Sequence, residues 1–120
     1  MTASVSIVLP FRDSEETIDE CIQSIQAQEL QNWELLAVND NSSDSSESIV
    51  RKYAEQDSRI NLLQSIDPGL VAALNLGVKH SATSLIARMD ADDRMFPKRL
   101  DSQVGFMQKN PDTGLVSCQV

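Results

Sequence analysis

The sequence predicts an α/β fold in which a mostly parallel β-sheet is covered by helices on both faces. Short aliphatic and β-branched runs alternate along the chain with segments whose apolar residues recur at helical spacing. The short runs end in proline or in clusters of Asn, Asp and Ser, which form turns. Strands that alternate with helices are joined by right-handed crossovers and therefore lie parallel to one another. With 120 residues, of which 41% are hydrophobic and 23% charged, the chain can bury one core.

Five segments have the length and composition of strands, and the four segments between them have the one-sided apolar pattern of helices packed on a sheet. The predicted strands are residues 5–9, 33–38, 60–63, 84–89 and 114–118. The order β-α-β-α-β-α-β-α-β is that of a Rossmann-like sheet. The fifth strand ends close to the last residue, so we expect residues 1–120 to be part of a larger domain.

Two of the predicted helices carry local capping signals. Asp13 is followed three residues later by Glu16, and Asp44 is followed by Glu47. This spacing is typical of a capping box, in which the two side chains accept hydrogen bonds from the free N–H groups of the first turn. We therefore expect the first two helices to begin directly after Asp13 and Asp44.

Eighteen acidic residues against ten Lys and Arg give the chain a formal net charge of −8. Nucleic acids and acidic membrane surfaces bind positively charged patches, so this excess disfavours both as partners. No run approaches the ~18 apolar residues of a transmembrane helix, and the N-terminus lacks the pattern of a secretory signal. Cys21 and Cys118 are far apart and lie in apolar patterns, as reduced core cysteines do. We therefore expect a cytoplasmic protein without a transmembrane segment.

The loops after the first, second and fourth predicted strands are polar or acidic. They comprise residues 10–13, 39–42 and 90–93. Open α/β sheets bind ligands beyond the carboxyl ends of their strands, near the point where the strand order changes direction. We therefore expect these three loops to converge on one crevice.

The last of these loops holds three acids, Asp90, Asp92 and Asp93. At about 4 Å, each like-charged pair costs roughly 1 kcal/mol in water and about 4 kcal/mol at a partly buried site. A divalent cation would offset this repulsion, and Mg²⁺ or Mn²⁺ commonly binds one or two carboxylates together with substrate phosphates. A phosphate ligand fits the same idea, because an acidic protein needs a cation to hold an anion. The alternative is a solvated acidic turn that caps the following helix.

The other two loops offer groups for a planar base. The Asp40 carboxylate can accept a hydrogen bond from a base N–H or a ribose hydroxyl, and Pro10 with Phe11 could form the floor of a pocket. Asp40 could equally build the turn before the next helix, and Pro10 could simply end its strand. The sequence has neither a P-loop motif nor the glycine-rich motif of NAD-binding domains after its first strand, which disfavours both classes.

Taken together, five blocks of the sequence resemble the N-terminal half of family 2 inverting glycosyltransferases, which have the GT-A fold. The blocks are residues 5–10, 26–28, 33–44, 73–77 and 89–93. They occur in the order in which the family has them, and the resemblance runs from about Val5 to the end of the chain. It implies that residues 1–120 form the N-terminal donor-binding part of a glycosyltransferase domain, the nucleotide-binding half, without the acceptor-binding half.

The resemblance also implies roles for individual residues. Pro10 and Phe11 would lie against the base of the donor, and Asp40 would contact a uracil ring. Asp92 would ligate a Mn²⁺ or Mg²⁺ ion that bridges the diphosphate. Asp90 would approach the ribose or a water on the metal, and so also counts as a metal-site residue.

Three positions differ from the residues that are usual in the family. Asn39 stands in the place of an acid, and Arg12 and Asp13 stand where Tyr and Asn are common.

The implied reaction transfers a sugar from a nucleoside-diphosphate sugar, in the first place a UDP-sugar, to a hydroxyl of a carbohydrate or glycan acceptor with inversion. Polysaccharide and cell-wall biosynthesis use such reactions. The cation would stabilise the leaving diphosphate, and a carboxylate base would deprotonate the acceptor. In the family this base comes later in the chain, so we expect it beyond Val120 and expect this chain to bind nucleotide but transfer little or no sugar. The full-length protein could lie at the inner face of the membrane.

Two other classes stay open on the residues alone. A sugar-nucleotidyl transferase shares the α/β form and the acidic metal site, although its usual glycine-rich loop is missing after the first strand. A non-catalytic nucleotide- or metal-binding module, or a structural half-domain, would have the same pattern without the reaction. A sheet edge exposed at the end of the chain could drive homodimerisation.

Overall fold

The computed structural model describes residues 3–110 and residue 112. Within them, four parallel strands form one sheet in the order β3-β2-β1-β4. The strands are β1 (Val5–Phe11), β2 (Trp33–Asn39), β3 (Ile60–Gln64) and β4 (Ile86–Arg88). The helices are α1 (Ile18–Gln26), α2 (Ser46–Gln56), α3 (Leu70–His80) and α4 (Arg99–Lys109). The predicted α/β sheet is confirmed, while the strand expected at 114–118 and Cys118 lie outside the described residues.

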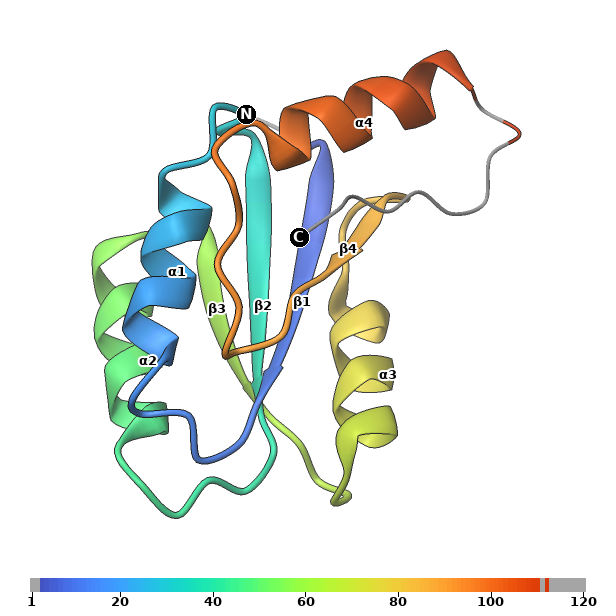
Figure 1. Ribbon diagram of the computed structural model, residues 1–120. Helices are drawn as coiled ribbons and strands as arrows, with labels where there is room; N and C mark the ends of the chain where they lie inside the picture. The colour runs from blue at the N-terminus through green and yellow to red at the C-terminus, as the bar shows by residue number, and fades with distance from the viewer. Residues whose placement is uncertain (1–2, 111, 113–120) are drawn as a thin grey trace.

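Helices cover both faces of the sheet, with α1 and α2 on one face and α3 on the other (Figure 1). Side chains along a strand point alternately to the two faces. Ile7 and Leu9 of β1 therefore join one hydrophobic core with Ile18 and Ile22 of α1, while Val8 points toward α3. Because β1 supplies both layers, all seven of its residues are buried.

The strand order changes direction at β1. From β1 the chain passes to β2 and then to β3 on one side, and afterwards crosses to β4 on the other side of β1. All four strands are parallel, so the loops that leave β1, β2 and β4 emerge at the same end of the sheet (Figure 1). This is the end at which α/β sheets bind ligands.

The capping box expected at Asp13 is wrong. Helix α1 begins at Ile18, with Thr17 at the N-cap position. Asp13 has a left-handed backbone (φ 48°), and its carboxylate accepts a hydrogen bond from the backbone N–H of Ser43 at 2.7 Å. A long-range contact has therefore replaced the local one. The capping box expected at Asp44 is also wrong, because Ser45 is the N-cap residue of α2 and the Glu47 carboxylate accepts from Asn39 and Arg51. Asp44 does accept a hydrogen bond from the N–H of Ser46, the first residue of α2, at 2.9 Å.

Among the helices of the described residues, none is both long and apolar enough to span a bilayer.

Close packing of α3 on the sheet depends on Gly77. A Cβ atom at this position would collide with Cγ1 of Val8 and lie 3.3 Å from its Cγ2. Valine is stiff about χ1, and it sits in the central strand, so it has little freedom to move aside. At Gly105, in α4, such a Cβ would have no heavy atom of the described residues within 4 Å, apart from its chain neighbours and the backbone of its own helix.

The pair of glycines gives a test of this packing. We expect Gly77→Ala to lower the free energy of unfolding by about 1–3 kcal/mol, as overpacked cores do. Gly105→Ala should instead raise it by about 0.5–1 kcal/mol, because alanine is the better helix former. Urea unfolding followed by circular dichroism measures both. Equal effects of the two substitutions would show that α3 does not need this close approach.

Candidate functional site

An open cleft of about 430 Å³ lies at the carboxyl ends of the strands. Residues from the loop after β1 form most of its wall, and the loops after β2 and β4 and the start of α3 complete it. The lining residues are Pro10, Phe11, Arg12, Asp13, Ser14, Glu15, Glu16, Thr17, Asp44, Leu70, Asp90, Ala91 and Asp92. Four of the five residues predicted from the sequence, Pro10, Phe11, Asp90 and Asp92, therefore line one cleft.

The cleft is strongly acidic. Six of its thirteen lining residues are Asp or Glu, and Arg12 is the one basic residue among them. The Arg12 side chain is 64% exposed and lies 4.0 Å from the Asp13 carboxylate, so this ion pair is weak. An anion that enters such a cleft meets repulsion unless a cation comes with it.

The three acids after β4 lie on a turn, residues 90–93, which we call the acidic turn. The N–H of Asp93 donates to the carbonyl oxygen of Asp90 at 3.1 Å and closes it. Ala91 is buried in the core at 7% exposure, whereas the three acids are exposed. One carboxylate oxygen from each acid lies within 4.8 Å of the others. Three adjacent hard oxygen donors are a donor set that suits Mg²⁺ or Mn²⁺.

The negative charge of the acidic turn acts on two neighbouring side chains, Arg88 and Cys21. Arg88 lies 3.4 Å from the Asp90 carboxylate in a half-exposed ion pair. Cys21, on α1, is buried beneath the turn, and its Sγ donates to the carbonyl oxygen of Asp90 at 3.6 Å. Burial, followed by the negative charges of Asp93 and Asp92, raises the pKa of the Cys21 thiol to about 12. Cys21 is therefore a neutral core thiol, as the sequence predicted.

A polar stripe on α1 and its flanking residues holds the backbone of the segment from the acidic turn to α4. The stripe consists of Thr17, Cys21, Ser24 and Gln28, spaced by four, three and four residues. Thr17 donates to Ala91 O at 3.0 Å, and Ser24 Oγ accepts from Met95 N at 2.9 Å.

Gln28 ends the stripe and is 1% exposed. Its Nε2 donates to Phe96 O at 2.7 Å, and its Oε1 accepts from Leu100 N at 3.1 Å. Sequence reasoning missed this stripe, although small polar residues at helical spacing within an apolar face were a visible signal.

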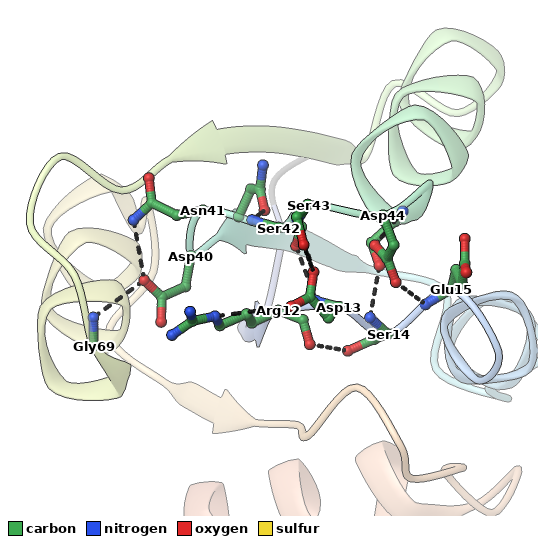
Figure 2. A network of polar contacts seen from close by, with 12 residues as sticks. Arg12, Asp13, Ser14, Glu15, Asp40, Asn41, Ser42, Ser43, Asp44 and Gly69 are labelled. Atoms are coloured by element: carbon green, nitrogen blue, oxygen red, sulfur yellow. Dashed lines mark hydrogen bonds and ion pairs between the residues drawn. The ribbon is translucent and has the colours of Figure 1, made fainter.

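The loops after β1 and β2 are joined by reciprocal hydrogen bonds, and Figure 2 shows those of Asp13 and that between Glu15 and Asp44. Asp13 accepts from Ser43 N, while its own N–H donates to Ser42 Oγ at 3.1 Å. Glu15 N donates to Asp44 Oδ2 at 3.2 Å, and Glu15 Oε2 accepts from Ser45 N at 3.1 Å. We call this set of contacts the loop clasp.

Asp44 takes part in the loop clasp and also in the start of α2. Hydrogen bonds from Ser46, and then from the N–H of Glu15, hold its pKa below the usual value of an aspartate. Asp44 is therefore a carboxylate at neutral pH, and it adds a negative charge to the wall of the cleft.

Asp40 does not line the cleft but lies beside it, at the end of β2. It is 7% exposed, and its N–H donates to the carbonyl oxygen of Phe11 at 2.9 Å. Its Oδ1 accepts from the N–H of Gly69 at 3.1 Å and from the Asn41 amide at 3.4 Å (Figure 2). Oδ2 accepts no hydrogen bond from the described residues. Asp40 therefore fixes the start of α3 with one oxygen and keeps the other available.

Asn39, at the end of β2, is surrounded by polar groups that suit an amide. Its Nδ2 donates to Glu47 Oε2 at 3.2 Å and to Gln64 Oε1 at 3.1 Å, and its Oδ1 accepts from Ser42 N at 3.0 Å. Asn39 is 2% exposed. An aspartate here would face the Glu47 carboxylate at close range, so the asparagine is matched to its neighbours.

The Phe11 side chain lines the cleft without exposing a free aromatic face. It lines the cleft but is only 2% exposed and belongs to the hydrophobic core. Its ring is thus a fixed part of the cleft wall, and it is held by the same core that supports β1.

A parallel sheet whose strand order changes direction at β1, with an acidic turn after β4, fits the GT-A glycosyltransferase fold that the sequence resemblance implies. The chain belongs to this class through its sequence as well. The family model described as glycosyl transferase family 2 matches residues 6–120, and the chain is a member of that family.

Two relatives illustrate the sequence match. The chain is 40% identical over 108 residues to EpsE of Bacillus subtilis (strain 168), which covers 88% of this chain and 39% of EpsE. It is 37% identical over 107 residues to UDP-Glc:alpha-D-GlcNAc-diphosphoundecaprenol beta-1,3-glucosyltransferase WfgD of Escherichia coli, which covers 88% of this chain and 42% of WfgD. The chain thus spans about two fifths of the length of these relatives.

Two solved structures show the same fold. S. aureus TarS 1-349 in complex with UDP superposes with a TM-score of 0.82 at 22% identity, over 97% of this chain and 38% of that one. The mannosyltransferase PcManGT from Pyrobaculum calidifontis, in complex with GDP-Man and Mn²⁺, superposes with a TM-score of 0.80 at 25% identity, over 99% of this chain and 36% of that one.

Proposed function

We propose that this chain is the donor-binding part of a metal-dependent glycosyltransferase that takes a nucleoside-diphosphate sugar, and UDP-sugar in particular. The observation that carries the proposal is the acidic cleft, which is lined by the end of β1, the loops after β1 and β2, and the acidic turn. WfgD, a relative at 37% identity, is named for a UDP-Glc donor, which supports the uracil nucleotide. We assign none of the described residues to the general base.

The charge of the cleft argues for a cation. A diphosphate would meet six carboxylates and one arginine. The acidic turn provides oxygen donors for a divalent ion, and PcManGT was solved with Mn²⁺ beside its GDP-Man. We assign Asp90 and Asp92 as the residues that would hold Mn²⁺ or Mg²⁺. The ion would act as a Lewis acid for the diphosphate as the sugar leaves.

The base would be placed by the other two loops. The free Oδ2 of Asp40 can accept the imide N–H of uracil, and Pro10 with Phe11 forms the adjacent wall of the cleft. The loop clasp ties the segment that follows Phe11 to the segment that follows Asp40. The base and the diphosphate would therefore be held by separate parts of the site. This would keep the bond between the sugar and the diphosphate in a fixed position relative to the acceptor.

The metal assignment predicts the effect of Asp92→Asn. We expect UDP with MnCl₂ to raise the unfolding temperature of the parent more than UDP alone, since a ligand at ~100 times its Kd adds about 2.7 kcal/mol. Asp92→Asn should abolish the Mn²⁺-dependent part of this shift and keep the rest. Asp101→Asn, the same change at an exposed acid of α4, is the control. A full Mn²⁺ effect in Asp92→Asn would refute the assignment, and no shift with UDP under any condition would favour a structural half-domain.

The base assignment predicts a different effect for Asp40→Asn. The asparagine oxygen can still accept from Gly69, but its NH₂ group would face the N–H of uracil. We expect UDP affinity without metal to fall about 10- to 100-fold, the range for a lost hydrogen bond to a charged group, about 1.5–3 kcal/mol. CDP should lose less, because N3 of cytosine is an acceptor. Isothermal titration calorimetry with both nucleotides measures this, and unchanged UDP affinity would contradict the role of Asp40.

A further inference from the structure

The hydroxyl of Thr17 is used in an unexpected way. Threonine at an N-cap usually accepts a hydrogen bond from an N–H of the first helical turn. Thr17 is the N-cap residue of α1 but makes no side-chain cap hydrogen bond. Its Oγ1 instead donates to the carbonyl oxygen of Ala91 at 3.0 Å, with Ser14 O more distant at 3.5 Å. The Thr17 hydroxyl thus bonds to a residue 74 positions later in the chain and does not cap its own helix.

Ala91 occupies a critical place in the acidic turn. It separates Asp90 and Asp92, so the orientation of its two peptide groups sets the directions in which both carboxylates leave the backbone. Its side chain is buried, and its carbonyl oxygen is held by Thr17. The preceding carbonyl, that of Asp90, accepts from Cys21 Sγ at 3.6 Å and from Asp93 N at 3.1 Å. The two carbonyls inside the turn are thus fixed by α1, while the carboxylates stay exposed.

The remainder of the polar stripe fixes the other end of this segment. Ser24 and Gln28 hold the backbone between Met95 and Leu100. Of the four stripe residues, Thr17 alone lines the cleft. A substitution at Thr17 should therefore affect the carboxylates of the acidic turn while disturbing the core less than a substitution elsewhere in the stripe.

We propose that Thr17 is a positioning residue for the cation, which orients Asp90 and Asp92 through the backbone of Ala91. The inference rests on the proposed function, since it takes the acidic turn as the metal site. Groups that orient metal ligands typically change metal affinity 10- to 100-fold when removed. Thr17 acts through one backbone carbonyl, so we place its effect at the lower end, about tenfold.

Two substitutions at Thr17 separate the hydroxyl from the shape of the side chain. Thr17→Val keeps the shape and removes the donor, whereas Thr17→Ser keeps the donor and removes a methyl group. Thr83→Val is the control for the loss of a threonine hydroxyl away from the site. The Thr83 hydroxyl donates to the carbonyl oxygen of Leu85 at 2.8 Å and lies 2.7 Å from Ser6 Oγ. It lies before β4, at the end of that strand opposite the acidic turn.

The measurement is the affinity of the 120-residue chain for Mn²⁺ in the presence of saturating UDP, from the electron paramagnetic resonance signal of free Mn²⁺. We expect about tenfold weaker Mn²⁺ binding in Thr17→Val, and parent-like binding in Thr17→Ser and Thr83→Val. UDP affinity without metal should be that of the parent in Thr83→Val, and in Thr17→Val it should change less than the Mn²⁺ affinity does. Circular dichroism spectra like that of the parent establish that each variant is folded.

The outcomes distinguish this inference from the function on which it rests. If the parent binds Mn²⁺, Asp92→Asn does not, and Thr17→Val binds like the parent, Thr17 has no positioning role and the metal site stands. If Thr83→Val weakens Mn²⁺ binding as much as Thr17→Val, the effect is one of general stability and the inference is wrong. If the parent with UDP binds no Mn²⁺, the metal site falls and this inference falls with it.

Discussion

The arrangement of the cleft depends on how the acidic turn is anchored. Three carboxylates on four consecutive residues repel one another, so their side chains cannot be the source of their order. The anchor is the main chain, held by hydroxyl, thiol and amide groups of the polar stripe on α1. Because α1 is itself packed on β1 through Ile18 and Ile22, the acidic turn is tied to the strand whose end, Pro10 and Phe11, also lines the cleft.

Each side of the cleft is fixed by a different kind of interaction. The acidic turn is fixed by neutral donors on a helix, whereas the loops after β1 and β2 are fixed by charged side chains that accept hydrogen bonds from backbone N–H groups in the loop clasp. Asp13 and Asn41 have left-handed backbones, with φ of 48° and 56°, a conformation that Asp and Asn tolerate better than most residues. The carboxylates of the loop clasp therefore hold the two loops in place, and they also add negative charge to the cleft.

How far the sequence predicts this site follows from the range of each interaction. The strands and the polar loops at their ends were predictable, because periodicity and turn composition are local, and so were Asp90 and Asp92, since their spacing on a loop after a strand is visible in the chain. The capping box at Asp13 failed because Ser43, 30 residues later, competes for the same carboxylate. The spacing of Thr17 and Gln28 is visible in the sequence, but their hydrogen-bond partners are 74 and 68 residues away, and no local pattern specifies those partners.

The division between a fixed backbone and free side chains would suit the proposed binding of an ion together with an anion. Fully buried carboxylates would carry a large desolvation penalty before any ion arrived, and carboxylates on a mobile loop would lose conformational entropy on binding. In the acidic turn the backbone is already ordered by α1, while the three side chains remain in water. An ion that arrives with a diphosphate therefore needs to order only a few side-chain torsions. The proposed ion would offset part of the repulsion that the six carboxylates of the cleft would exert on a diphosphate, so each of the two ligands would make the binding of the other more favourable.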